Sequence, residues 1–201
     1  MIIIHFILSL FFLIYLQLFT FLFFILSFPL SLFSGVGRAI QYFMMKWSIR
    51  LLLAICFIRV KIYGVPKPEL KEKTIFVSNY PSLMDPLYLI AYFPRRIRIT
   101  AEPNMFKIPL IGKVMRSIGC IAIESSDGFA GKILNALGRG EPVWIFKGVE
   151  KVKVDDNLIK LAKICEARIV PFQINNSENI LPRRSMLFSP GVVTIKIQSD
   201  V

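Results

Sequence analysis

The stretch TIFVSNYPSLMDPLYLIAYF, residues 74–93, decides which fold we expect for this chain. It begins with the apolar run TIFVSN, which is typical of a short buried strand, and continues through a polar turn. Asp85 then precedes Pro86 and a second apolar run; Asp at the N-cap and Pro at the first helical position form a good helix start. The stretch therefore predicts a strand, a turn and a helix in succession.

The same alternation continues to the end of the chain. Further strands are expected at RIRITAE (96–102), CIAIE (120–124), PVWIF (142–146), RIVPFQI (168–174) and GVVTIKI (191–197). Helices are expected within IPLIGKVMRSIG (108–119), FAGKILNALGRG (129–140) and NLIKLAKICEA (157–167). Strands alternating with helices predict an α/β fold, with a mixed sheet flanked by helices.

The N-terminal tract is chemically different from this domain. Residues 1–37 contain no Asp, Glu, Lys or Arg. The tract is longer than the roughly 20 residues that cross a bilayer core, and it lacks the cationic start of a secretory signal. We expect residues 1–36 to be embedded in a membrane, either crossing it with a tilt or turning back near Pro29.

Residues 37–62 are apolar with scattered cations. They predict an interfacial helix, or alternatively a helix packed on the domain, followed by a first strand. The cations are Arg38, Lys46, Arg50, Arg59 and Lys61, and no acidic residue lies among them. Cations beside a membrane segment predict that the following domain, residues 63–201, is on the cytoplasmic face. They also suit contact with anionic lipids.

The composition argues against two other classes of function. The net charge of +12 raises nucleic acid as a partner, but no helix-turn-helix, zinc or aromatic RNA-binding signature accompanies it, so none is expected. The three cysteines are isolated, and the one histidine, His5, lies in the apolar tract. We therefore expect no metal site and no bound cofactor.

Several motifs in order resemble the glycerolipid acyltransferase family, whose best-known members acylate lysophosphatidic acid. The family's first block, Asn-His-x-Ser-x-x-Asp after a strand, corresponds to residues 79–85. Its second block, Phe-Lys-x-Pro-x-x-Gly, corresponds to residues 106–112, within MFKIPLIGKVMRSIG. LGRGEPVWIF (137–146) fits the next helix, turn and strand, and Val170-Pro171 fits the last block. Four blocks in order are fairly specific, and the resemblance covers roughly residues 38–198.

The resemblance implies a substrate class and a set of site residues. A lysophospholipid would accept the acyl group, and acyl-CoA or acyl-carrier protein would donate it. Membrane lipids are expected partners, and an acyl-carrier protein or a partner subunit is a further candidate. By position, the catalytic motif falls on Tyr80 and Asp85. The substrate-binding positions are Asn79, Ser82, Lys107, Pro109, Gly112, Lys147, Gly148 and Lys151.

The first block departs from the family at its central residue. The family's histidine is the general base, which the aspartate orients, and a positioned base contributes about 10²–10⁴-fold in rate. Here that position is Tyr80. A tyrosine hydroxyl has a reference pKa of about 10, so roughly one in a thousand is ionised near neutral pH. Asp85 would orient no imidazole, and its expected role as an N-cap accounts for it without catalysis.

The third block departs as well. The family reads Phe-Pro-Glu-Gly-Thr-Arg where this chain reads FKGVEK, residues 146–151. Without a gap, Gly148 stands at the glutamate position; with a one-residue gap, Gly148 remains the glycine and the glutamate is deleted. In both alignments that carboxylate is missing, although Glu150 is nearby. Ser125 stands where the family usually has a phosphate-binding arginine.

Three hypotheses follow. The first is a membrane-bound pseudoenzyme with an acyltransferase fold that binds lipid or a partner protein. The second is a divergent acyltransferase in which Asp85, or a water held by Tyr80 and Asp85, serves as the base. The third is a basic membrane module whose role is unrelated to acyl transfer, which would leave the four ordered blocks unexplained.

Overall fold

The computed structural model describes residues 36–64, 73–94, 96–109, 111–123, 127–148, 151–152, 154–182 and 189–197, with scattered helical positions between 7 and 25. Most of the predicted membrane-embedded segment, residues 1–36, lies outside the described residues. The same is true of Ser125 and Glu150.

Seven strands and seven helical segments make up the described chain. The strands are β1 (Ile58–Tyr63), β2 (Thr74–Ser78), β3 (Arg98–Ala101), β4 (Ile121–Ala122), β5 (Val143–Phe146), β6 (Arg168–Asn175) and β7 (Gly191–Ile197). The helices are α2 (Val36–Ile55), α3 (Asp85–Tyr92), α4 (Ile111–Ile118), α5 (Asp127–Gly138), α6 (Asp156–Cys165) and the short α7 (Ser177–Ile180). A 3₁₀ turn, η1 (Pro103–Lys107), precedes α4.

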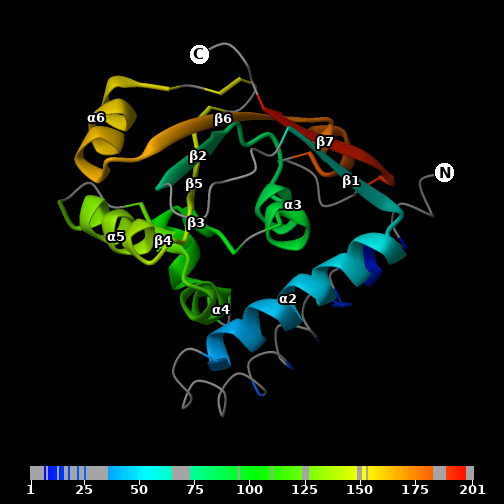
Figure 1. Ribbon diagram of the computed structural model, residues 1–201. Helices are drawn as coiled ribbons and strands as arrows, with labels where there is room; N and C mark the ends of the chain where they lie inside the picture. The colour runs from blue at the N-terminus through cyan, green and yellow to red at the C-terminus, as the bar shows by residue number, and fades with distance from the viewer. Residues whose placement is uncertain are drawn as a thin grey trace.

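The strands form one mixed sheet in the order β1-β7-β6-β2-β5-β3-β4. All neighbouring pairs are parallel except β6 and β7, which are antiparallel. Strand β2 lies near the centre, with Ser78 opposite Phe146 of β5 and Phe172 of β6. The predicted α/β class with a mixed sheet is therefore confirmed, and the strand that opens the quoted stretch is central to it (Figure 1).

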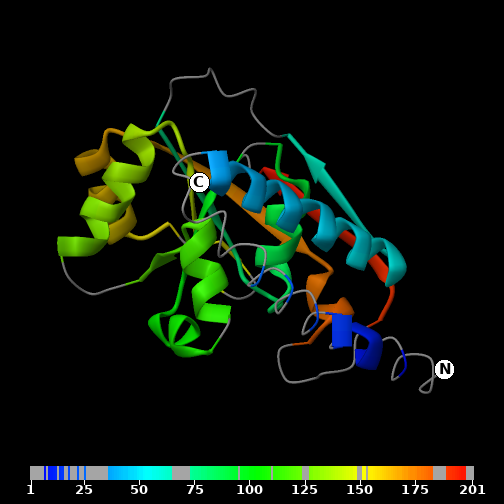
Figure 2. The same cartoon turned by 90° about the horizontal axis from the view of Figure 1, so that it is seen from below.

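Alternate residues of β2 face two separate cores. Phe76 packs in the core that α2, α3 and α4 cover, together with Trp144 and Phe172. Ile75 and Val77 pack in the second core, which α5 and α6 cover. The sheet is thus the middle of three layers, and this is why its central strands are apolar on both faces (Figure 2).

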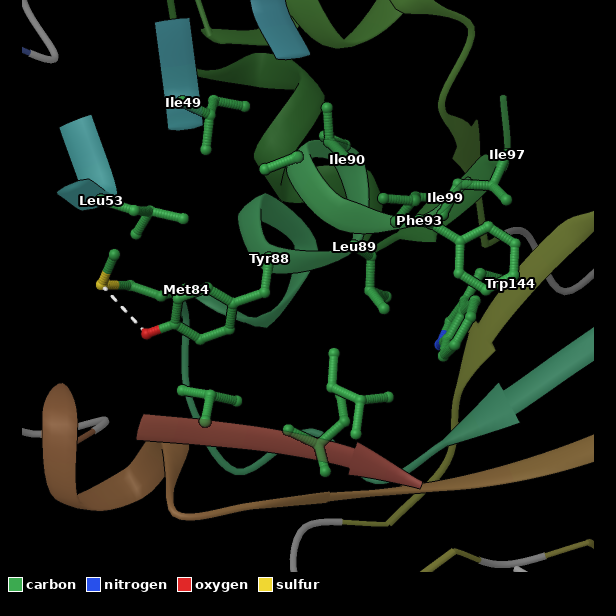
Figure 3. Close-up of a cluster of buried hydrophobic side chains, with 14 of the residues drawn as sticks. Ile49, Leu53, Met84, Tyr88, Leu89, Ile90, Phe93, Ile97, Ile99 and Trp144 are labelled. Carbon is green, nitrogen blue, oxygen red and sulfur yellow. Dashed lines mark hydrogen bonds between the residues drawn. The ribbon is translucent and has the colours of Figure 1, made fainter. Parts of the chain in front are cut away.

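Helix α3 is enclosed between α2 and the sheet (Figure 3). Tyr88 and Leu89 are fully buried, and the Tyr88 hydroxyl donates to the sulfur of Met84 at 3.7 Å. Ile49 and Leu53 of α2 pack in the same core. Burial raises the pKa of the Tyr88 phenol far above its usual value, so this hydroxyl stays neutral and structural.

Two of the interfacial cations hold α3 in place. Lys46 donates from Nζ to the carbonyl oxygen of Phe93 at 2.8 Å, and Arg50 donates from Nε to that of Ala91 at 2.7 Å. Cations are favourable at a helix C-terminus, where carbonyl groups lack partners within the helix. Burial, followed by the neighbouring Arg50 charge, lowers the pKa of Lys46. From the sequence, these cations were expected to mark the cytoplasmic side and to contact anionic lipids, with packing of the helix on the domain as the alternative.

Within the described part of the chain, no helix combines the length and the apolar character that a bilayer crossing requires. Helix α2 is 20 residues long but carries cations along its length.

Candidate functional site

The residues of the first block follow the carboxyl end of β2 and lead into α3. In an open sheet with parallel strands, this edge is where ligand sites form, because the loops after neighbouring strands meet there. The loop after β5 lies beside the block, since Lys147 donates its backbone N–H to Ser78 at 2.7 Å. The structure therefore brings residues 79–85 and 147–148 together.

Asn79 ties the turn to strand β6. Its side-chain nitrogen donates to the carbonyl oxygen of Ile174 at 2.8 Å, and its oxygen accepts from the Ile174 N–H at 2.7 Å. Asn79 is 1% exposed. A buried asparagine that satisfies both backbone groups of one residue stabilises the structure and is closed to substrate.

Ser82 and Asp85 hold the end of the turn together by side-chain-to-backbone hydrogen bonds. The prediction that Asp85 is the N-cap of the helix is wrong. Helix α3 begins at Asp85 and its N-cap is Met84, which makes no side-chain capping bond. Asp85 reaches backward: its Oδ2 accepts from the Ser82 N–H at 2.8 Å, while Ser82 Oγ accepts from the Met84 N–H at 3.2 Å. This resembles a capping box displaced toward the turn. Ser82 Oγ also donates to the carbonyl oxygen of Leu181 at 2.9 Å.

Tyr80 lies on the opposite, partly exposed side of the turn. Its ring stacks against Phe146, with ring centroids 4.7 Å apart and planes inclined by 33°. Its backbone N–H donates to the carbonyl oxygen of Gly148 at 2.9 Å. The residue at the position of the family histidine therefore packs with an aromatic residue at the end of β5.

The loop after β5 contains an ion pair that the sequence did not reveal. Lys147 Nζ lies 2.8 Å from Asp155 Oδ2, and Asp155 Oδ1 accepts from the Leu158 N–H as the N-cap of α6. The hydrogen bond from Lys147 holds the pKa of Asp155 below its usual value. Lys147, predicted to bind substrate phosphate, is thus already partnered by a carboxylate. Lys151 lies further along the loop and is exposed.

Gly148 has a φ of +86°, a conformation that side-chain-bearing residues rarely adopt. This favours the alignment in which Gly148 remains the family's glycine and the glutamate before it is deleted.

In the second block, the backbone at Gly112 lies against the backbone carbonyl of Phe106. Gly112 is buried at the start of α4, and a Cβ on it would overlap the carbonyl oxygen of Phe106. Lys107 and Pro109 are exposed beside this contact. Gly112 therefore has a packing role, while Lys107 is the residue of this block with a charge available at the surface.

Two further residues, Ser78 and Trp144, support the turn from the core, and neither was predicted to be a site residue. Ser78 Oγ accepts from Trp144 Nε1 at 2.8 Å and donates to the carbonyl oxygen of Asn79 at 3.0 Å. This links the centre of the core to the first residue of the turn.

Within the described part of the chain, no three His, Cys, Asp or Glu side chains are grouped to hold a metal ion.

Comparison with known proteins agrees with the resemblance read from the motifs. A model of the family described as Acyltransferase matches residues 58–196, which is most of the chain. The protein therefore belongs to the acyltransferase family. No curated protein matches the sequence.

A solved structure has the same fold. The crystal structure of the 1-acyl-sn-glycerophosphate (LPA) acyltransferase PlsC from Thermotoga maritima superimposes with a TM-score of 0.81 at 19% identity. The match covers 99% of this chain and 86% of that one. At this identity the likeness establishes the fold.

Proposed function

We propose that this protein is a membrane-bound glycerolipid-binding member of the acyltransferase family whose acyl-transfer activity is impaired or absent. The observation that carries the proposal is the environment of Tyr80. The phenol at the histidine position packs on Phe146, and the backbone N–H of Tyr80 donates to the carbonyl oxygen of Gly148. A phenol is too weakly ionised near neutral pH to replace an imidazole as a general base.

The position of Asp85 argues against its use as a substitute base. Its side chain is 0% exposed, and one carboxylate oxygen accepts from the backbone of Ser82. A general base must come within hydrogen-bond reach of the proton that it removes. A completely enclosed carboxylate does not meet an acceptor alcohol without movement of the turn.

Helix α2 supports membrane association. Five large apolar side chains recur every three or four residues along its outer face and are each at least 38% exposed: Ile40, Phe43, Trp47, Leu51 and Ile55. Exposed apolar stripes of this kind are typical of interfacial helices or of partner surfaces. Arg50 lies 5.1 Å from the Trp47 ring, at the border of the stripe.

Vesicle flotation tests the membrane component. With vesicles of phosphatidylcholine and phosphatidylglycerol, we expect Phe43→Glu to lower the bound fraction several-fold, because it places a charge within the stripe. Ile164→Glu is the matched control: Ile164 is 66% exposed on α6, against 60% for Phe43. Equal flotation of both variants and the unaltered protein would show that the apolar stripe of α2 is not needed for vesicle binding.

A turnover assay tests the chemical component. The purified protein is supplied with lysophosphatidic acid and either acyl-CoA or acyl-carrier protein, and phosphatidic acid is measured. We expect turnover at least 100-fold below that of an active family member, together with saturable lysophosphatidic acid binding. Turnover at an ordinary enzymatic rate, abolished by Asp85→Asn, would establish the divergent-enzyme alternative.

A further inference from the structure

A second concave site lies at the amino ends of the strands, away from the first block, which follows the carboxyl end of β2. It is a pocket of about 210 Å³ between α5 and the starts of β3, β4 and β5. Arg98 is the first residue of β3, and Glu141 lies two residues before β5. The first block follows the carboxyl end of β2, which runs parallel to β5, whereas the pocket lies at the amino ends of β3, β4 and β5, so the two sites are separate.

The pocket is strongly basic. Arg98, Lys132 and Arg139 line it, and Glu141 is the acidic residue among the lining side chains. Glu141 is already paired: its Oε2 accepts from Arg98 at 2.6 Å, and its Oε1 lies 3.6 Å from a guanidinium nitrogen of Arg96. The carboxylate is therefore shared by Arg98 and Arg96, and with Lys132 and Arg139 also in the lining the pocket keeps a positive potential that attracts anions.

The side chains that could donate hydrogen bonds to an anion come from the region of α5 and from Arg98 of β3. Lys132 and Asn135 lie three residues apart on α5, Arg139 directly follows the end of that helix, and all three line the pocket. Arg98 lies beside them, and its side chain is 12% exposed. Gly119 has a φ of +80°, and a Cβ there would overlap the Arg98 guanidinium, so this glycine makes room for the arginine.

We propose that this pocket, defined by Arg98, Lys132, Asn135 and Arg139, binds the phosphate group of a small phosphorylated molecule. Arginine and lysine are the usual phosphate ligands, and an asparagine amide supplies a neutral donor beside them. The volume suits a phosphate or diphosphate group. The site does not depend on the acyl-transfer chemistry, because none of its residues belongs to the first block.

Calorimetric titration with inorganic pyrophosphate tests this directly, at constant ionic strength with sodium chloride as the reference salt. We expect saturable binding by the unaltered protein and at least tenfold weaker binding by K132Q/R139Q. Both changed residues are exposed, so the variant keeps its fold. The charge-matched control is K160Q/K163Q, which removes two exposed lysines from α6 and is expected to bind as the unaltered protein does.

Two outcomes would overturn the proposal. One is the absence of saturable pyrophosphate binding; if phosphatidic acid vesicles then capture the unaltered protein but not K132Q/R139Q, the pocket belongs to a membrane surface. The other is equal weakening of pyrophosphate binding in the two double variants, which would indicate diffuse attraction by the net charge. Binding of pyrophosphate without such capture supports a soluble ligand.

Discussion

The two sides of the turn after β2 differ in what they retain from the family. On the buried side, Asn79, Ser82 and Asp85 match the family motif and bond to backbone groups of β6, the turn itself and the segment after α7. On the partly exposed side, Tyr80 and Lys147 do not match, and they contact Phe146 and Asp155 instead. The three matching positions are buried and bonded to backbone groups, whereas the two positions that differ are partly exposed.

This difference shows why a match to a motif does not by itself establish an activity. Each matching residue in the turn has a structural explanation that is independent of catalysis. Removing one of them costs folding free energy, because it leaves buried backbone groups unpaired. Such residues can persist in a protein whose chemistry has been lost.

The largest effect on stability is expected on the buried side. Asn79→Ala leaves the N–H and the carbonyl of Ile174 without their side-chain partner, so we expect a loss of about 2–4 kcal/mol in the free energy of unfolding. Urea denaturation followed by circular dichroism measures it. The control is Asn157→Ala on the exposed face of α6. Similar small changes in both variants would remove the structural explanation for Asn79.

Two substitutions at Asp85 test whether its contribution to stability comes from the hydrogen bond to Ser82. Asp85→Ala removes the acceptor for the Ser82 N–H and is expected to cost about 1–3 kcal/mol. Asp85→Asn keeps an acceptor oxygen of the same shape, so its cost is expected to be clearly smaller. Urea denaturation of both variants distinguishes these values. If the two substitutions cost the same, the bond to Ser82 is not what Asp85 contributes.

A substitution at Gly148 tests whether the loop beside Tyr80 has the positive φ seen in the structure. Gly148→Ala places a side chain at positive φ and is expected to lower stability by about 1–2 kcal/mol. Gly131→Ala is the matched substitution: Gly131 is in α5 and a Cβ there has open space, so stability should rise by about 0.5–1 kcal/mol. Thermal unfolding measures both. Effects of the same sign would contradict the backbone geometry of the loop.

The Lys147–Asp155 pair is expected to have the smallest effect. Both side chains are more than one third exposed, so Lys147→Met should cost under about 1 kcal/mol. The folded pKa of Asp155 lies below its unfolded value. The pair's contribution is therefore present above about pH 4 and is lost as the pH falls through the folded pKa. The difference between variant and unaltered protein should shrink under acid conditions; an unchanged difference would show that the pair does not stabilise the fold.

Much of the fold was predictable from local pattern. The strands at 74–78, 143–146 and 168–175 are short, apolar and bounded by turn residues, and they form where expected. The end of α4 at Gly119 was also expected, and its positive φ explains it. The segments η1 and α7 were missed, because five and four residues carry too little periodic signal.

The site was harder to predict, because its contacts are long-range. The partner of Asn79 is 95 residues away, and Lys46 and Arg50 reach carbonyl groups more than 40 residues away. A sequence shows that these residues are polar but gives no register between β2 and β6. The N-cap expected at Asp85 was wrong because the preceding turn supplies a nearer backbone donor.

The most direct test of the central claim is the gain of activity on restoring the imidazole. Phosphatidic acid formation from lysophosphatidic acid and acyl-CoA is compared for the unaltered protein and the Tyr80→His variant. We predict that Tyr80→His raises the initial rate by at least 100-fold. An unaltered protein already as fast as the Tyr80→His variant would contradict the account.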